Sequence, residues 1–131
     1  RGVTLLLDTH VLWWAIYQPA RIPENWVSKL VDRSNPVFFS AASIWEIAIK
    51  SSLERPDFLH DADRTLQLAR QTGFVELPVS GEVAARVRDL PWYHRDPFDR
   101  LLIAQAKQMP ARLLTADNQF SIYSELVELI A

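Results

Sequence analysis

The sequence predicts an α/β fold, a three-layer α/β/α arrangement around a central, mainly parallel sheet. Two observations carry this expectation: short apolar runs recur along the chain, and a longer stretch of helical character separates most runs from the next. Strands that alternate with helices pair in parallel, and the helices cover both faces of the sheet. With 131 residues, 49% of them hydrophobic and 23% charged, we expect one globular domain over residues 1–131.

The expected strands are short apolar runs bounded by turn residues. Val3–Leu7 is the first of them and leads directly into a helix, and the turn-like Ser34–Pro36 precedes the second. Such runs are typical of strands that are buried on both faces. In chain order, we expect strands at residues 3–7, 37–39, 74–77, 113–115 and 126–130.

The expected helices begin or end at capping residues and prolines. Ser40 or Ser43 caps the helix after the second strand, and Asp61 and Gly73 bracket the next helix. Asp96 and the proline after it form a strong helix start. In chain order, we expect helices at about residues 9–17, 23–33, 40–53, 61–72, 80–90 and 97–109, with a helical turn at 118–123.

The composition excludes several classes of protein. The absence of cysteine excludes disulfides, thiolate metal sites and a cysteine nucleophile. None of the three glycines lies in a phosphate-binding loop pattern. A net charge of −2 argues against binding to duplex nucleic acid through bulk charge. No run reaches the roughly 18 apolar residues of a membrane span, so we expect no membrane association and a cytoplasmic location.

Two acidic residues follow expected strands. Asp8 comes directly after the first strand, and Asp117 lies two residues beyond the strand at 113–115. Parallel strands end at the same edge of the sheet, which is where open α/β sheets place their ligands. Each residue also has a plain structural explanation, because Asp8 can cap the following helix and Asp117 can form an ordinary turn.

Two further acids lie on helix faces that we expect to be buried. Asp99 shares an apolar stripe with Leu102 and Ile103, although it can also pair with Asp96 at the start of the helix. Glu46 lies within Ile44–Ile49, a segment that is apolar nearly all round and therefore largely buried. The alternative for Glu46 is a surface pair with the lysine four residues later.

Four acids that converge need a compensating charge. Buried like charges repel and take up protons unless a cation neutralises them. Oxygen ligands without cysteine, and without a histidine pair at metal spacing, favour Mg²⁺ or Mn²⁺ over zinc. Such an ion activates water without a serine, cysteine or lysine nucleophile, which suits phosphodiester hydrolysis. The sequence therefore predicts catalytic and metal-binding roles for Asp8, Glu46, Asp99 and Asp117.

Other polar residues adjoin these acids. Some can orient the carboxylates through hydrogen bonds or cap helices, namely Thr9, Ser43, Thr115 and Asp96. His94, Arg95 and Arg100 flank the helix start that carries Asp99 and can donate to RNA phosphates, unless they belong to a solvated loop.

The sequence around the four acids resembles the PIN-domain family, and within it the VapC-like ribonuclease toxins of toxin–antitoxin pairs. The resemblance covers residues 3–130 and is carried by LLLDTH, SIWEI, HRDPFDRLLIAQA and LTAD, in this order. It implies a Mg²⁺- or Mn²⁺-dependent endoribonuclease that forms a homodimer and is inhibited by a small cognate antitoxin. The acids of the family correspond to Asp8, Glu46 and Asp99, and its more variable fourth acid corresponds to Asp117.

Three alternatives belong to other functional classes. A phosphatase of the haloacid-dehalogenase type needs a second aspartate two residues after the first, where this chain has His10. A phosphorylated receiver domain needs an acid pair before its first helix and a lysine after its last strands, and neither is present. A PIN-like module that only binds remains the third alternative, against which the presence of all four acids argues.

An aromatic helix predicts a contact with another chain. Val11–Tyr17 is apolar or aromatic on every face, and neighbouring helical positions point about 100° apart. Trp13 and Trp14 therefore do not fit one narrow core stripe together, unless neighbouring helices cover the whole segment. We expect at least one of them to lie near the surface and to contact a second protomer or an antitoxin.

Overall fold

The computed structural model describes residues 2–53, 61–91, 96–122 and 125–130. Its strands are β1 Leu5–Leu7, β2 Val37–Ser40, β3 Val75–Leu77, β4 Arg112–Thr115 and β5 Val127–Leu129. Its α-helices are α1 Thr9–Tyr17, α2 Glu24–Val31, α3 Ala41–Ser52, α4 Ala62–Thr72, α5 Gly81–Arg86 and α6 Pro97–Gln108. Short 3₁₀ helices are η1 Pro19–Arg21, η2 Val87–Asp89 and η3 Asn118–Ile122. The expected elements are all confirmed, with small shifts at their ends.

The five strands form one sheet in the order β3-β2-β1-β4-β5, and every pairing is parallel. β1 is central, and its Leu7 lies opposite Phe39 on one side and Leu114 on the other. The chain therefore reverses its direction of winding around β1. At such a reversal the loops that follow neighbouring strands diverge and leave room for a site at the carboxyl edge.

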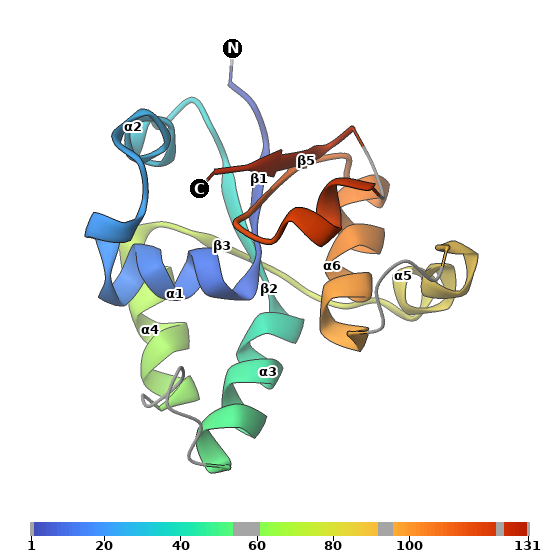
Figure 1. The fold of residues 1–131 in the computed structure, drawn as a ribbon. Helices are drawn as coiled ribbons and strands as arrows, with labels where there is room; N and C mark the ends of the chain where they lie inside the picture. The colour runs from blue at the N-terminus through green and yellow to red at the C-terminus, as the bar shows by residue number, and fades with distance from the viewer. Residues whose placement is uncertain (1, 54–60, 92–95, 123–124, 131) are drawn as a thin grey trace.

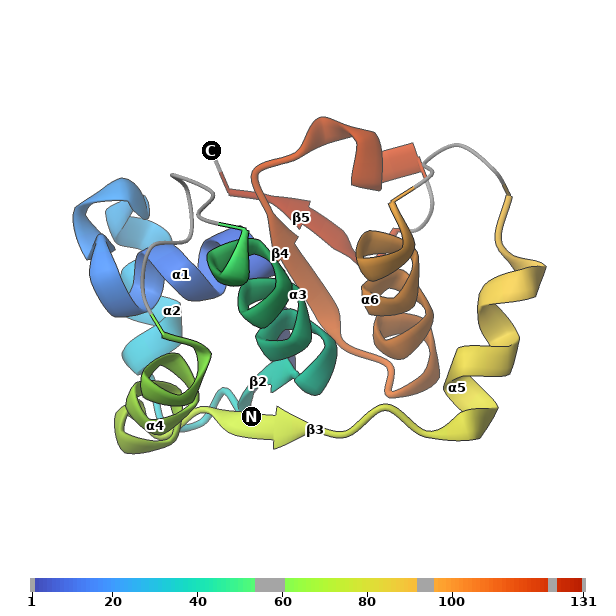
Figure 2. The ribbon, with the colours of Figure 1, turned by 90° about the horizontal axis from the view of Figure 1, so that it is seen from below.

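Helices cover both faces of the sheet, which confirms the three-layer architecture (Figure 1, Figure 2). Leu5 and Leu7 pack into a core with α1, α3 and α4. Leu6, between them, points to the opposite face and packs with α5 and α6. This alternation is the normal consequence of strand geometry, and burial on both faces explains why the strand is apolar throughout. Within the described ranges, no helix is both long and apolar enough to cross a lipid bilayer.

Local signals fixed several helix ends as expected. Asp61 caps α4 through a hydrogen bond from the Asp63 amide, and Gly73 ends the helix with φ of +97°. That left-handed conformation favours glycine because it lacks a Cβ. Ser40, rather than Ser43, caps α3 by accepting from the Ala42 amide.

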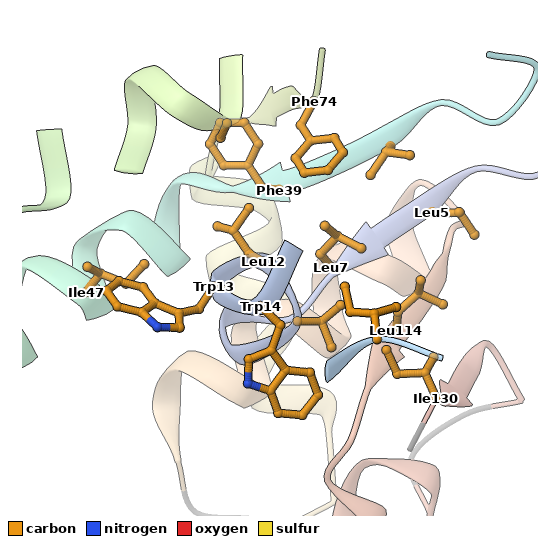
Figure 3. Close-up of a cluster of buried hydrophobic side chains, with 14 residues drawn as sticks. Leu5, Leu7, Leu12, Trp13, Trp14, Phe39, Ile47, Phe74, Leu114 and Ile130 are labelled. Atoms are coloured by element: carbon orange, nitrogen blue, oxygen red, sulfur yellow. The ribbon is translucent and has the colours of Figure 1, made fainter. Parts of the chain in front are cut away.

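The expectation for Trp13 and Trp14 is wrong, because both are buried, with 6% and 8% of their surface exposed (Figure 3). Trp13 packs on Tyr17 one turn later, with ring centroids 4.4 Å apart. Trp14 is covered by the guanidinium of Arg21, which lies 4.5 Å from the ring centroid. Both tryptophans are thus covered by residues of their own chain. Their exposure therefore gives no reason to expect a contact with a second protomer or an antitoxin.

The expectation that Ile44–Ile49 is buried nearly all round is also only half right. Glu46 and Ile47 are buried, but Trp45 is 60% exposed and Ile49 is exposed as well. Figure 1 shows α3 extending beyond the end of the sheet.

Candidate active site

Asp8 lies directly after β1 at the carboxyl edge of the sheet and is buried. Its Oδ1 accepts a hydrogen bond of 2.8 Å from the Val11 amide, so it caps α1 as well as facing the site. Desolvation raises the pKa of Asp8 to about 6, although hydrogen bonds from Thr115 and Val11 act in the opposite direction. The negative charge of Glu46 also raises this pKa, which places Glu46 in the neighbourhood of Asp8.

Glu46 points inward from α3 and only 3% of its surface is exposed. Its Oε1 accepts from the Thr9 hydroxyl at 2.7 Å, and its Oε2 lies 2.5 Å from the Lys50 ammonium. The Thr9 and Ser43 hydroxyls are 2.9 Å apart. Because the Thr9 proton is given to the carboxylate, Ser43 supplies the proton between the two hydroxyls. Both carboxylate oxygens are therefore held in place. Glu46 is a buried acid as predicted, and its pair with Lys50 forms but is not the surface pair of the alternative.

Asp99 lies in the first turn of α6, and its pKa is raised to about 8. Burial is the largest cause, followed by the negative charges of Asp96, Glu46, Asp8 and Asp117. Each of these charges raises the pKa of Asp99, so the four carboxylates lie within electrostatic range of it. Asp8, Glu46 and Asp117 therefore lie near Asp99. As the sequence predicted, two of the four acids follow strand ends and two lie on helices.

Asp117 and Thr115 complete this edge of the sheet. Thr115 ends β4 beside β1, is fully buried, and accepts from the Asp117 amide at 3.0 Å. Asp117 Oδ1 accepts from the Gln119 amide, so the residue also forms the turn that was its structural explanation. Thr115 consequently positions both Asp8 and the backbone of Asp117.

The phosphate-contact expectation is wrong for Arg100. Its side chain is 2% exposed, and its guanidinium donates to the backbone carbonyls of Val87, Leu90 and Pro91. It therefore holds η2 and the following loop against α6 instead of reaching solvent. His94 and Arg95, the other two candidates, lie outside the residues that the structure describes.

Asp96 caps α6, as expected from the sequence. Its Oδ1 accepts from the amides of Phe98 and Asp99, at 2.9 and 3.2 Å. We expect Asp96→Ala to lower the free energy of unfolding by about 1 kcal/mol relative to Asp96→Asn, because asparagine keeps the cap. Urea denaturation of both variants checks this difference, and comparing them with each other removes the effect of the lost charge. Equal stabilities would mean that the cap contributes nothing.

The donor set suits a hard divalent cation. All four predicted ligands are carboxylates, and the repulsion that raises the pKa of Asp99 is what a bound cation would relieve. Within the described residues, no three acidic or histidine side chains are close enough to enclose one ion between them. Mg²⁺ commonly binds through one or two carboxylates and keeps several of its waters. The residues therefore fit a partly hydrated ion, with some carboxylates acting through water.

The raised pKa values predict an unusual pH dependence of stability in the absence of metal. Asp99 has an ordinary value of 3.8 and a folded value of about 8, so the folded chain binds this proton more tightly than the unfolded chain. The free energy of unfolding must then fall as the pH rises from about 4 to about 8. Asp8 contributes with the same sign, up to a pH of about 6.

Thermal unfolding in EDTA should show a higher Tm at about pH 5 than at about pH 8. The decline of the Tm between these two pH values should be smaller in Asp99→Asn. A Tm that rises across this range in the parent chain would contradict it.

The fold and the acids together define an α/β/α protein with a carboxylate site at the carboxyl edge of a parallel sheet. The chain belongs to the PIN-domain family, because the PIN domain matches residues 5–126. The resemblance expected from the sequence is thus confirmed.

The chain is also similar to proteins that are already known. The chain is 32% identical to ribonuclease VapC22 of Mycobacterium tuberculosis (strain ATCC 25618 / H37Rv) over 118 residues, which cover 88% of each protein. Its fold is similar to that in the crystal structure of VapBC2 from Rickettsia felis bound to a promoter DNA fragment. The TM-score there is 0.72 at 16% identity, over 96% of this chain and 98% of the other. It is also similar to FitAB bound to the IR36 DNA fragment, with a TM-score of 0.61 at 22% identity, over 95% and 93% of the two chains.

One functional candidate was undervalued at the level of sequence. The sequence suggests a surface pair of Lys50 with Glu46, yet the pair is largely shielded from solvent. The signal was the spacing, because a lysine four residues after a glutamate on a helix lies on the same face and can reach its carboxylate.

Proposed function

We propose that this chain is a metal-dependent endoribonuclease and the toxin of a toxin–antitoxin pair. The observation that carries the proposal is the convergence of Asp8, Glu46 and Asp117 around Asp99. The 32% identity to a ribonuclease over most of both chains gives the reaction class. Phosphodiester hydrolysis suits the site because the donors are all carboxylates, and the chain has no cysteine to act as a nucleophile.

The residues have separate roles in this proposal. Asp8, Glu46, Asp99 and Asp117 hold Mg²⁺ or Mn²⁺, directly or through water. When bound, the ion supplies positive charge that stabilises the phosphoryl transition state and activates the attacking water. Thr9, Ser43 and Lys50 fix the orientation of Glu46, as their contacts with its two oxygens indicate. Thr115 does the same for Asp8.

The partners follow from the family. We propose an RNA substrate, a cognate antitoxin and a homodimer, acting in the cytoplasm as one domain. The similarity to VapC22 supports the substrate class. The fold is the one seen in VapBC2 and FitAB, which is in keeping with an antitoxin partner.

The deciding experiment is incubation of the purified chain with cellular RNA in Mg²⁺, in Mn²⁺ and in EDTA, followed by sequencing of the new ends. We expect internal cleavage that requires either ion. Hydrolysis of a phosphate monoester instead would favour the phosphatase alternative. RNA binding without cleavage in either ion would make the chain a binding module and would contradict the proposal.

A further inference from the structure

Trp45 presents an aromatic ring to solvent beside the acidic site. Its side chain is 60% exposed, whereas Trp13 and Trp14 are buried. The ring contacts Phe98 of α6, with centroids 5.1 Å apart and planes at 73°. An edge-to-face contact of this kind lets Phe98 cover at most one face of the indole. A broad apolar surface is therefore left open and is held in orientation by a second ring.

This aromatic pair joins the two helices that carry acids. Trp45 precedes Glu46 on α3, and Phe98 precedes Asp99 on α6. The two helices lie side by side and contact each other (Figure 2). The negative charge of Glu46 is felt at Asp99, so the acids flanked by the rings are themselves close. The Trp45–Phe98 contact thus joins α3 and α6 at the helical turns that carry Glu46 and Asp99.

Electrostatic attraction alone is a weak explanation for RNA binding at this site. The chain carries a net charge of −2, and the acid cluster repels phosphates. Two basic residues near the acids are already engaged: Lys50 pairs with Glu46, and Arg100 is buried against backbone carbonyls. Uncharged contacts would add affinity that does not depend on these two cations. Unpaired RNA bases stack on aromatic side chains, and this stacking requires no particular base.

We propose that Trp45, oriented by Phe98, is a stacking platform for an unpaired base of single-stranded RNA next to the scissile phosphate. The proposal rests on the ribonuclease function proposed above and adds a binding residue to it. It selects single-stranded over duplex RNA, because a paired base is already stacked on its neighbours and has no free face to offer.

The test is a binding measurement in an Asp99→Asn background, which stops cleavage while Mg²⁺ is present. The probe is a short fluorescein-labelled single-stranded RNA of mixed sequence, followed by anisotropy. We expect Trp45→Ala to weaken binding about tenfold, and Trp45→Phe to retain most of the affinity. The ratio of the dissociation constants of Trp45→Ala and of its Asp99→Asn parent should not change with salt concentration, since the substitution removes no phosphate contact. The same strand without bases should bind Trp45→Ala and the Asp99→Asn parent equally.

Leu53→Ala is the matched control. Leu53 is 66% exposed and lies at the end of the same helix, two turns from Trp45. We expect this variant to bind the RNA like its parent. Phe98→Ala should weaken binding less than Trp45→Ala, and the double variant should lose less than the sum of the two, because the rings act as a unit.

Three results would overturn the stacking platform. Unchanged affinity in Trp45→Ala is the first, and an equal loss on the strand without bases is the second. The third is a change of oligomeric state, measured by light scattering, in both single variants, Trp45→Ala and Leu53→Ala. That result would make this face of α3 a contact between copies of the chain. If the native chain cuts RNA and Trp45→Ala retains the native KM, only the stacking proposal is wrong. If the native chain neither binds nor cuts RNA, the proposed function fails as well.

Discussion

Asp99→Asn is expected to lower RNA cleavage about 1,000-fold or more while leaving the fold intact. Asp99 is the carboxylate on which the charges of Asp96, Glu46, Asp8 and Asp117 converge, so its loss removes the centre of the proposed cation site. Asparagine has almost the same shape but no charge. The measurement is the rate of cleavage of cellular RNA in Mg²⁺ by the purified variant and by the native chain.

A second measurement separates a lost ligand from a damaged fold. Without metal, Asp99→Asn should melt at a higher temperature than the native chain at about pH 8, because a buried and repelled charge has been removed. Mg²⁺ should raise the Tm of the native chain more than that of the variant. Asp89→Asn, an exposed acid of η2, serves as the control and should behave like the native chain. Cleavage at the native rate by Asp99→Asn would show that the catalytic assignment is wrong.

Local signals allowed most of the fold to be predicted from the sequence. The strands are short and apolar on both faces, and caps such as Asp61, Gly73 and Asp96 act within one turn of the helix that they bound. What a single sequence does not contain is the strand order β3-β2-β1-β4-β5, because that order depends on contacts between elements far apart in the chain. The carboxyl edge of parallel strands does not depend on strand order, which is why the convergence of the acids could still be predicted.

The wrong predictions of tryptophan burial have one physical cause. The periodicity of a sequence shows which residues share a helix face, but not which other elements cover that face. Trp13 and Trp14 are both buried because they pack into the core formed with β1, α3 and α4, while Tyr17 and Arg21 cover further faces. Trp45 lies in an equally apolar segment and is 60% exposed, because its edge-to-face contact with Phe98 covers only part of the indole. Burial of aromatic residues therefore followed from tertiary neighbours in each case.

Arg100 was misplaced for a related reason. It is adjacent to Asp99 in the chain, and proximity to an acidic site suggested a phosphate contact. Successive helical residues point about 100° apart, however, so a neighbour of a site residue commonly faces away from the site. In the structure, the guanidinium donates at 2.7 Å to the carbonyl of Pro91 and at about 3 Å to those of Val87 and Leu90. These bonds hold η2 and the two residues that follow it, Leu90 and Pro91, against α6.

Arg100→Ala is therefore expected to destabilise the chain by about 3–5 kcal/mol, because it removes the guanidinium donor to three backbone carbonyls and leaves a cavity where a fully buried side chain was. This corresponds to a Tm about 10–20 °C lower. Arg100→Lys should fall in between, since an ammonium does not reproduce the planar fork of the guanidinium. Arg86→Ala is the control: Arg86 is exposed, pairs only at the surface with Asp89, and should change stability by less than about 1 kcal/mol. Thermal and urea unfolding measure these differences. A stable Arg100→Ala variant whose RNA binding depends less on salt would restore the phosphate contact and contradict the structural role.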